Sequence, residues 1–78
     1  MPKVYMIITE KEFGRFEVKF ECTGDIWKWF KKHSKKSAAY DILEDVNHNE
    51  VHEFMYEAHA RKFAKRFEKL VTVVNVAA

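Results

Sequence analysis

Residues 15–22 read Arg-Phe-Glu-Val-Lys-Phe-Glu-Cys, and charged and apolar side chains alternate along the entire stretch. Because successive side chains of a strand point to opposite faces, this pattern predicts a half-buried β-strand with one solvated face. Phe16, Val18, Phe20 and Cys22 form the expected buried face. The hydrophobic core must lie on that side of the strand.

Two further strands are expected, one before this stretch and one at the C-terminal end of the sequence. Val4–Glu10 is rich in β-branched residues, and Lys11–Gly14 predicts a turn, so the first two strands form a hairpin. Leu70–Ala78 is apolar on both faces, which suits the interior of a sheet or an interface. We place it beside the first strand, which gives a three-stranded sheet of order 2-1-3.

Helices are expected between the hairpin and the last strand. Asp25 can cap the first helix, whose apolar positions have the i, i+3, i+4, i+7 spacing of an amphipathic helix: Ile26, Trp29, Phe30 and His33. A second helix begins near Ser37, with an inner face of Ala39, Ile42, Leu43 and Val46. Asn47-His48-Asn49 predicts a break.

A third helix is expected to run to about Glu68, with Asn47 and Glu50 placed as a capping box. The fold class is therefore α+β, with an N-terminal β-hairpin, two to three helices on one face and a C-terminal strand. Residues 1–78 make one domain, because 78 residues are too few for two.

Composition limits the classes of function. The chain has a single cysteine, so no intrachain disulfide can form, which is typical of a reducing compartment. No apolar run reaches the ~18–20 residues of a membrane span, and the N-terminus does not resemble a signal peptide. We expect a cytoplasmic protein. Two glycines are too few for a phosphate-cradling loop, which argues against nucleotide-binding enzymes.

The net charge of +2 hides a segmented distribution. Residues 25–37 carry five lysines and one acid, residues 38–60 carry six acids and no Lys or Arg, and residues 61–69 carry five bases and one acid. The two basic clusters consist of Lys28, Lys31, Lys32, Lys35 and Lys36, and of Arg61, Lys62, Lys65, Arg66 and Lys69. If they merge in the fold, they form a patch typical of polyanion-binding proteins. Alternatively, they are solvated helix faces that balance nearby acids.

Trp27 lies one step away from the inner face that holds Trp29, at the edge of the lysine face. There it can stack on an unpaired base while lysines contact phosphates, an interaction worth roughly 1–3 kcal/mol per base. The alternative is that Trp27 covers the flank of a thin core. Trp29 is expected in the core.

Three histidines, His48, His52 and His59, fall close to one line of a helix. We interpret His52 and His59 as half-buried, hydrogen-bonded side chains, because a zinc motif and a nearby cysteine are missing. Catalytic residues, cofactors and metals are not predicted, since no nucleophile and base fall into register. The one enzymatic alternative is a metal-free ribonuclease using His33 or His59 beside lysines.

Two functions follow from these patterns. The first is a small accessory protein that binds RNA or single strands through Trp27 and the two basic clusters. The second is a protein-binding inhibitor or adaptor, of the antitoxin or phage counter-defence kind, that uses the acidic middle segment or a sheet edge. Aromatic boxes, Gly-x-x-Gly loops and zinc-finger spacings of the common RNA-binding modules do not occur in the chain.

The C-terminal strand adds an expected interface. If one of its faces meets the helices, the other leaves apolar side chains open together with those of the first strand. The residues expected at a dimer or partner interface are Tyr5, Ile7, Val71 and Val73. A two-fold homodimer is the simplest way to cover them.

Overall fold

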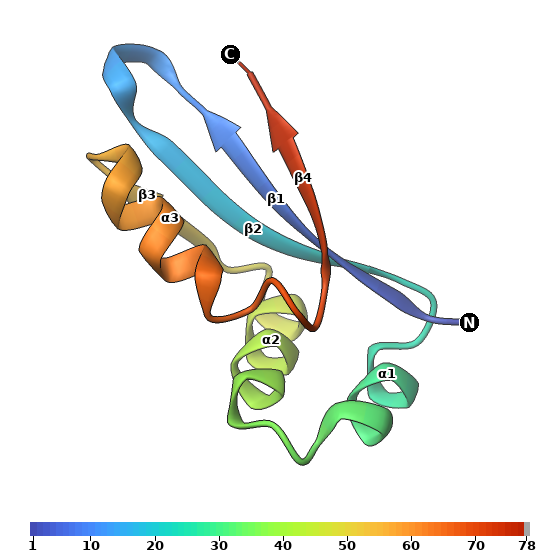
Figure 1. The fold of residues 1–78 in the computed structure, drawn as a ribbon. Helices are drawn as coiled ribbons and strands as arrows, with labels where there is room; N and C mark the ends of the chain where they lie inside the picture. The colour runs from blue at the N-terminus through green and yellow to red at the C-terminus, as the bar shows by residue number, and fades with distance from the viewer. Residues whose placement is uncertain (78) are drawn as a thin grey trace.

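The computed structural model describes residues 1–77 and shows a four-stranded mixed sheet with three α-helices on one face (Figure 1). In chain order the elements are β1 (Lys3–Glu10), a 3-10 turn η1 (Glu12–Gly14), β2 (Phe16–Thr23), α1 (Ile26–His33), α2 (Ser37–His48), β3 (Val51–Phe54), α3 (Glu57–Lys65) and β4 (Thr72–Val76). The α+β class is therefore confirmed.

The predicted hairpin is confirmed, with β1 antiparallel to β2 and Ile7 opposite Lys19. The alternation in β2 becomes a burial pattern, since Phe16, Val18 and Phe20 are all buried under the helices. Each such side chain stabilises the fold by roughly 1.5–3 kcal/mol when fully buried. The alternating stretch therefore fixes the side of the sheet on which the helices pack.

The sheet order is β3-β2-β1-β4, so the expectation of three strands in order 2-1-3 is wrong by one strand. The placement of the C-terminal strand is confirmed, because β4 runs parallel to β1. Its described part is shorter than the expected Leu70–Ala78, and Ala78 lies outside the described residues. The extra strand, β3, pairs antiparallel with the other edge of β2.

The break after α2 explains the extra strand. Asn49 adopts a left-handed conformation (φ 51°, ψ 41°), and the N–H groups of Asn49 and Glu50 donate back to the carbonyls of Val46 and Asp45. A left-handed residue at this position ends a helix. The break predicted here is confirmed, but the capping box is wrong, because Asn47 lies inside α2.

After this break the chain extends instead of starting a helix. His52 and Phe54 point to the helix side and are half-buried, whereas Val51 and Glu53 are exposed. The extended backbone of β3 pairs with the edge of β2 that β1 leaves open. The next helix, α3, begins only at Glu57. The expected long third helix is therefore replaced by a strand and a shorter helix.

The core lies between the helices and the inner face of the sheet. Its most central aromatic contact joins Phe67, just after α3, to Phe20 of β2, with ring centroids 5.0 Å apart at 72°. Trp29 is buried, as predicted. Small buried residues let the helices approach the sheet closely, and they are Ala38, Ala39, Ala60 and Ala64.

The register of β4 corrects the predicted interface. Val73 lies beside Met6, and Val74 lies beside Ile7. Val73 therefore faces the helix side, and Val71 also packs against the core. The β4 residues that share the open face with Tyr5 and Ile7 are Thr72, Val74 and Val76.

The hairpin loop contains an unusual residue. Phe13 has φ 60° and ψ 31°, and its side chain is 92% exposed. A left-handed conformation costs an L-residue about 1–2 kcal/mol. Because the side chain buries almost nothing, no contact within the chain compensates for this strain.

Replacing Phe13 with Asn should raise the free energy of unfolding by about 0.5–1 kcal/mol, because Asn tolerates the left-handed region far better. Phe13→Ala is the matched control, since it removes the ring but keeps the strain. Urea denaturation of the three proteins measures the difference. An Asn variant no more stable than the Ala variant would show that the loop conformation is not strained.

Candidate nucleic-acid interface

The first helix presents one tryptophan to the core and one to solvent. The Asp25 carboxylate caps α1 by accepting a hydrogen bond from the Trp27 N–H at 2.9 Å, as predicted for this residue. This start fixes the helix phase, so Trp29 is 3% exposed and Trp27 is 53% exposed. Trp27 therefore has an accessible ring surface.

Trp27 belongs to a row of three aromatic side chains that crosses from α1 to α2. Its ring meets Phe30 edge to face at 6.2 Å, and Phe30 meets Tyr40 in the same way at 4.9 Å. Tyr40 is 55% exposed. We call Trp27, Phe30 and Tyr40 the aromatic row. Tyr40 was not among the predicted site residues, because only the packing of α2 against α1 reveals it.

The lysines of the first basic cluster are all exposed. They are Lys28, Lys31, Lys32, Lys35 and Lys36. None of them forms an ion pair with an Asp or Glu of residues 1–77. The interpretation that nearby acids balance this cluster is therefore not supported by the ion pairs of the described chain.

The two basic clusters meet where α2 begins. Lys36, Arg66 and Lys69 line a surface hollow of about 260 Å³ together with Ser37, Ala38 and Leu70. Lys69 also lines a neighbouring hollow of about 270 Å³ with Lys3 and His33. We call the five lysines of the first basic cluster together with Arg66 and Lys69 the basic surface. Segments about thirty residues apart thus contribute to it.

The residues of the second basic cluster differ in their contacts within the chain. Arg66 forms an ion pair with Asp41 of α2 and lies over the Phe67 ring at 5.1 Å. Arg61 pairs with Glu57 at 3.4 Å and donates to the Asn75 side chain of β4 at 2.9 Å. Arg61 is therefore committed to contacts within the chain. Lys62 and Lys65 are exposed on α3 and make no ion pair in residues 1–77.

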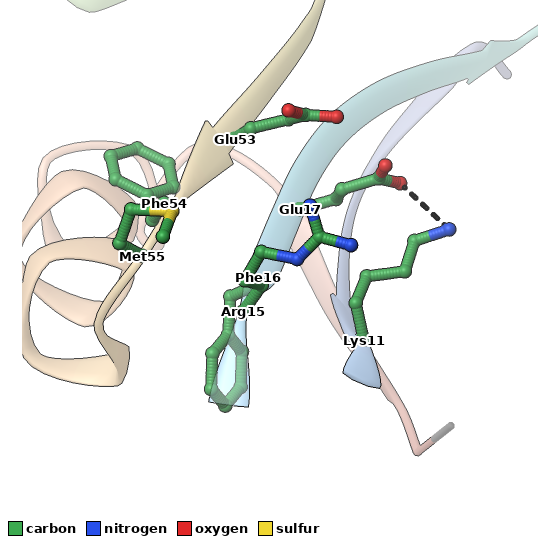
Figure 2. Close-up of a pocket in the computed structure, with 7 residues that line it drawn as sticks. All are labelled: Lys11, Arg15, Phe16, Glu17, Glu53, Phe54 and Met55. Atoms are coloured by element: carbon green, nitrogen blue, oxygen red, sulfur yellow. Dashed lines mark ion pairs between the residues drawn. The ribbon is translucent and has the colours of Figure 1, made fainter. Parts of the chain in front are cut away.

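A different hollow, of about 280 Å³, lies beside the hairpin loop (Figure 2). Glu17 and Glu53 are direct partners on β2 and β3, and Figure 2 shows the Lys11–Glu17 ion pair, 3.4 Å long, next to them. The other lining residues are Arg15, Phe16, Phe54 and Met55. The two carboxylates offset Lys11 and Arg15, so the lining has no net positive charge with which to attract a polyanion.

The histidines are distributed over three elements, so the predicted single line is wrong. His48 ends α2, His52 lies on β3 and His59 lies on α3. His52 is half-buried and its Nε2 contacts the Asp45 carboxylate at 2.6 Å, as the hydrogen-bonded interpretation predicts. His59 is exposed, so that interpretation is wrong for it. Within residues 1–77 no cluster of His, Cys, Asp or Glu is arranged to hold a metal ion.

The remaining chemistry-bearing side chains are separated or engaged. His33 donates a hydrogen bond from Nδ1 to the Trp29 carbonyl at 2.8 Å and stacks on the Trp29 ring at 4.5 Å. His59, on α3, contacts the Tyr56 ring. The structure thus does not combine these two histidines into one site.

Cys22 is a partly buried thiol that packs against the core. Burial raises its pKa above the ordinary value, and the negative charge of Asp25 raises the pKa further. A raised pKa leaves less thiolate at neutral pH, and the thiolate is the nucleophilic form. Cys22 is therefore a weak nucleophile.

Replacing Asp25 with Asn should accelerate alkylation of Cys22 at neutral pH, because it removes a charge that raises the thiol pKa. Asn still caps a helix, so α1 should remain intact. In both proteins the rate should increase as pH rises toward the thiol pKa, and the variant should reach its plateau at lower pH. Iodoacetamide labelling followed by mass spectrometry measures the rates. Equal rates at every pH would show that Asp25 has no influence on the thiol.

No helix in residues 1–77 is long and apolar enough to cross a lipid bilayer. Comparison with family models, curated proteins and solved structures gives no match for this chain. The arguments about function therefore depend on the surfaces described above.

Proposed function

We propose that this protein is a small, non-enzymatic accessory protein that binds RNA or another single-stranded nucleic acid. The observation that carries the proposal is the combination of the aromatic row of α1 and α2 with five exposed lysines, free of ion pairs within residues 1–77, on α1 and in the connection to α2. Proteins that bind single strands combine positive charge along the backbone path with aromatic rings on which bases stack.

Each part of the surface has a distinct role in this proposal. The ammonium groups of α1 neutralise phosphates and release counterions, which supplies affinity without sequence preference. Trp27 and Tyr40 offer rings to unpaired bases, and Phe30 between them holds both rings in place. Lys36 and Lys69 continue the positive charge toward the end of α3, whereas the charge of Arg66 beside them is offset by its ion pair with Asp41.

The aromatic row also favours single strands over duplexes. In a duplex the faces of the bases are stacked on one another, so an exposed ring on a helix surface cannot reach them. A duplex would therefore use only the lysines. RNA and single-stranded DNA present the same stacking faces and phosphates, and a binding comparison distinguishes them.

Protein binding is the second candidate function, and the sheet edge supports it better than the acidic middle segment does. Two of the six acids in that segment form ion pairs with arginines of the chain, and they are Asp41 and Glu57. These acids are partly neutralised, which weakens the segment as a docking surface for a basic partner.

Changing Lys28, Lys31 and Lys35 to Glu should abolish binding to a labelled oligo(U) at low salt while the circular dichroism spectrum is unchanged. For the unmodified protein, the logarithm of affinity should fall linearly with the logarithm of salt concentration, with a slope of about −0.7 for each phosphate neutralised. Fluorescence anisotropy measures both.

The matched control changes Lys11, Arg15 and Lys19 to Glu, which alters net charge equally but on the hairpin. This control should retain most of the affinity. Equal losses in the two triple variants would contradict a defined site, and no binding by the unmodified protein at low salt would end the nucleic-acid proposal.

The two tryptophans should separate binding from folding. Trp27→Ala should weaken oligo(U) binding by roughly 1–3 kcal/mol with little change in stability, because its ring is half-exposed. Trp29→Ala should lower the free energy of unfolding by about 3–5 kcal/mol, as truncation of a buried aromatic does. Anisotropy and urea denaturation provide the two readouts. A large stability loss at Trp27 with unchanged affinity would assign this ring to the core.

A further inference from the structure

β4 leaves one side of its backbone without a partner strand. It lies at the end of the sheet order, beside β1 only, and Figure 1 shows it at the margin of the sheet. All five of its residues are exposed, and the exposed fractions of Val73, Val74 and Val76 are 38%, 36% and 42%. A row of unpaired N–H and C=O groups next to apolar side chains is a template for another strand.

The two edges of the sheet differ in their protection. The β3 edge is four residues long and carries Glu53. The β4 edge has the sequence Thr-Val-Val-Asn-Val, with no charge and no proline. Short strands, charged side chains and proline are the features that keep sheet edges from pairing. The β3 edge is the shorter by one residue and carries a charge, whereas β4 has neither a charge nor a proline.

The sequence of β4 is complementary to itself. In an antiparallel pair related by a two-fold axis at Val74, Val74 lies opposite its own copy, Thr72 lies opposite Val76, and Val73 lies opposite Asn75. No two charged residues of β4 meet in this register, because β4 itself carries no charge, and the nearest cation that contacts it, Arg61, bonds to Asn75. The same arrangement at β3 would place Glu53 close to a second Glu53.

We propose that two copies of this chain pair through β4, antiparallel about Val74, to form a continuous eight-stranded sheet. A second copy is the occupant that fits, since a neutral strand has no charge with which to select a different partner, whereas its own side chains match across the axis. The assembly also ends at two copies. Only the two β3 edges remain, and both are protected, so a dimer forms and not a fibre.

The open face of the sheet supports the same arrangement. Tyr5 and Ile7 of β1 lie beside Thr72 and Val74 of β4, away from the helices. Pairing of two β4 strands joins these side chains from both copies into one apolar stripe across the axis. Contact between the copies at Val74 and Val76 removes part of the exposed apolar surface from water.

Disulfide cross-linking tests the register directly. In a Cys22→Ser background, Val74→Cys should form a disulfide-linked dimer under mild oxidation, because directly opposite residues have Cα atoms about 4.5–5.5 Å apart, within the range a disulfide spans. Val76→Cys should not link to itself, but it should link to Thr72→Cys when the two variants are mixed. Equal self-linking at residues 74 and 76 would overturn the proposed register.

Light scattering tests the dimer without introduced cysteines. At roughly 100 µM, far above the micromolar range of a modest interface, the unmodified protein should have twice the chain mass. Val74→Lys and Val74→Glu should each be mainly monomeric at this concentration, with a dissociation constant raised above roughly 100 µM, because like charges then lie directly opposite. An equimolar mixture of the two variants should recover a dimer.

Glu53→Lys is the matched control on the other edge, and it should leave the dimer intact. Circular dichroism establishes that each variant is folded. If the unmodified protein is monomeric at this concentration, the proposal is wrong and the β4 edge is open to a strand of another protein. A dimer that persists in both Val74 variants would also overturn the proposal, because the contact would then lie elsewhere.

Discussion

The pairing of β2 on both of its edges is the constraint on which the other elements depend. Its alternating side chains place Phe16, Val18 and Phe20 on one buried face, and β1 and β3 pair with its two edges. With only 78 residues, the chain buries about 60% of the surface that it would expose when unfolded, so this face supplies much of the core. The helices, and with them the basic surface, take their positions from contacts with it.

Local patterns sufficed for the hairpin, for α1 with its Asp25 cap and for the strand beside β1, because each depends on spacing within a few residues. β3 was mistaken for helix because Val51 and Phe54 are three residues apart, a spacing that a helix also allows. Residues 51–54 form a strand because Asn49 is left-handed and ends α2, and because the open edge of β2 is available for pairing. The first is a local backbone conformation and the second is a long-range contact.

The residues of the candidate interface also differ in whether the sequence alone could identify them. The exposure of Trp27 and of the α1 lysines follows from helix phase, so the sequence was enough to select them. The contact between Phe30 and Tyr40 and the hollow shared by Lys36 and Lys69 join residues from separate elements. The sequence could not separate Arg61 from the other bases either, because its partner Asn75 lies fourteen residues later on β4.

The two proposed surfaces would reinforce each other. A two-fold axis perpendicular to the sheet keeps the helices of both copies on the same face, so a dimer through β4 would present two basic surfaces to one side. One nucleic-acid strand long enough to reach both would bind the second surface at a high effective concentration. Weak, sequence-tolerant contacts to phosphates and bases would then add up along the strand. A chain too small to build a deep binding groove can in this way hold a long, flexible ligand by repetition of one shallow surface.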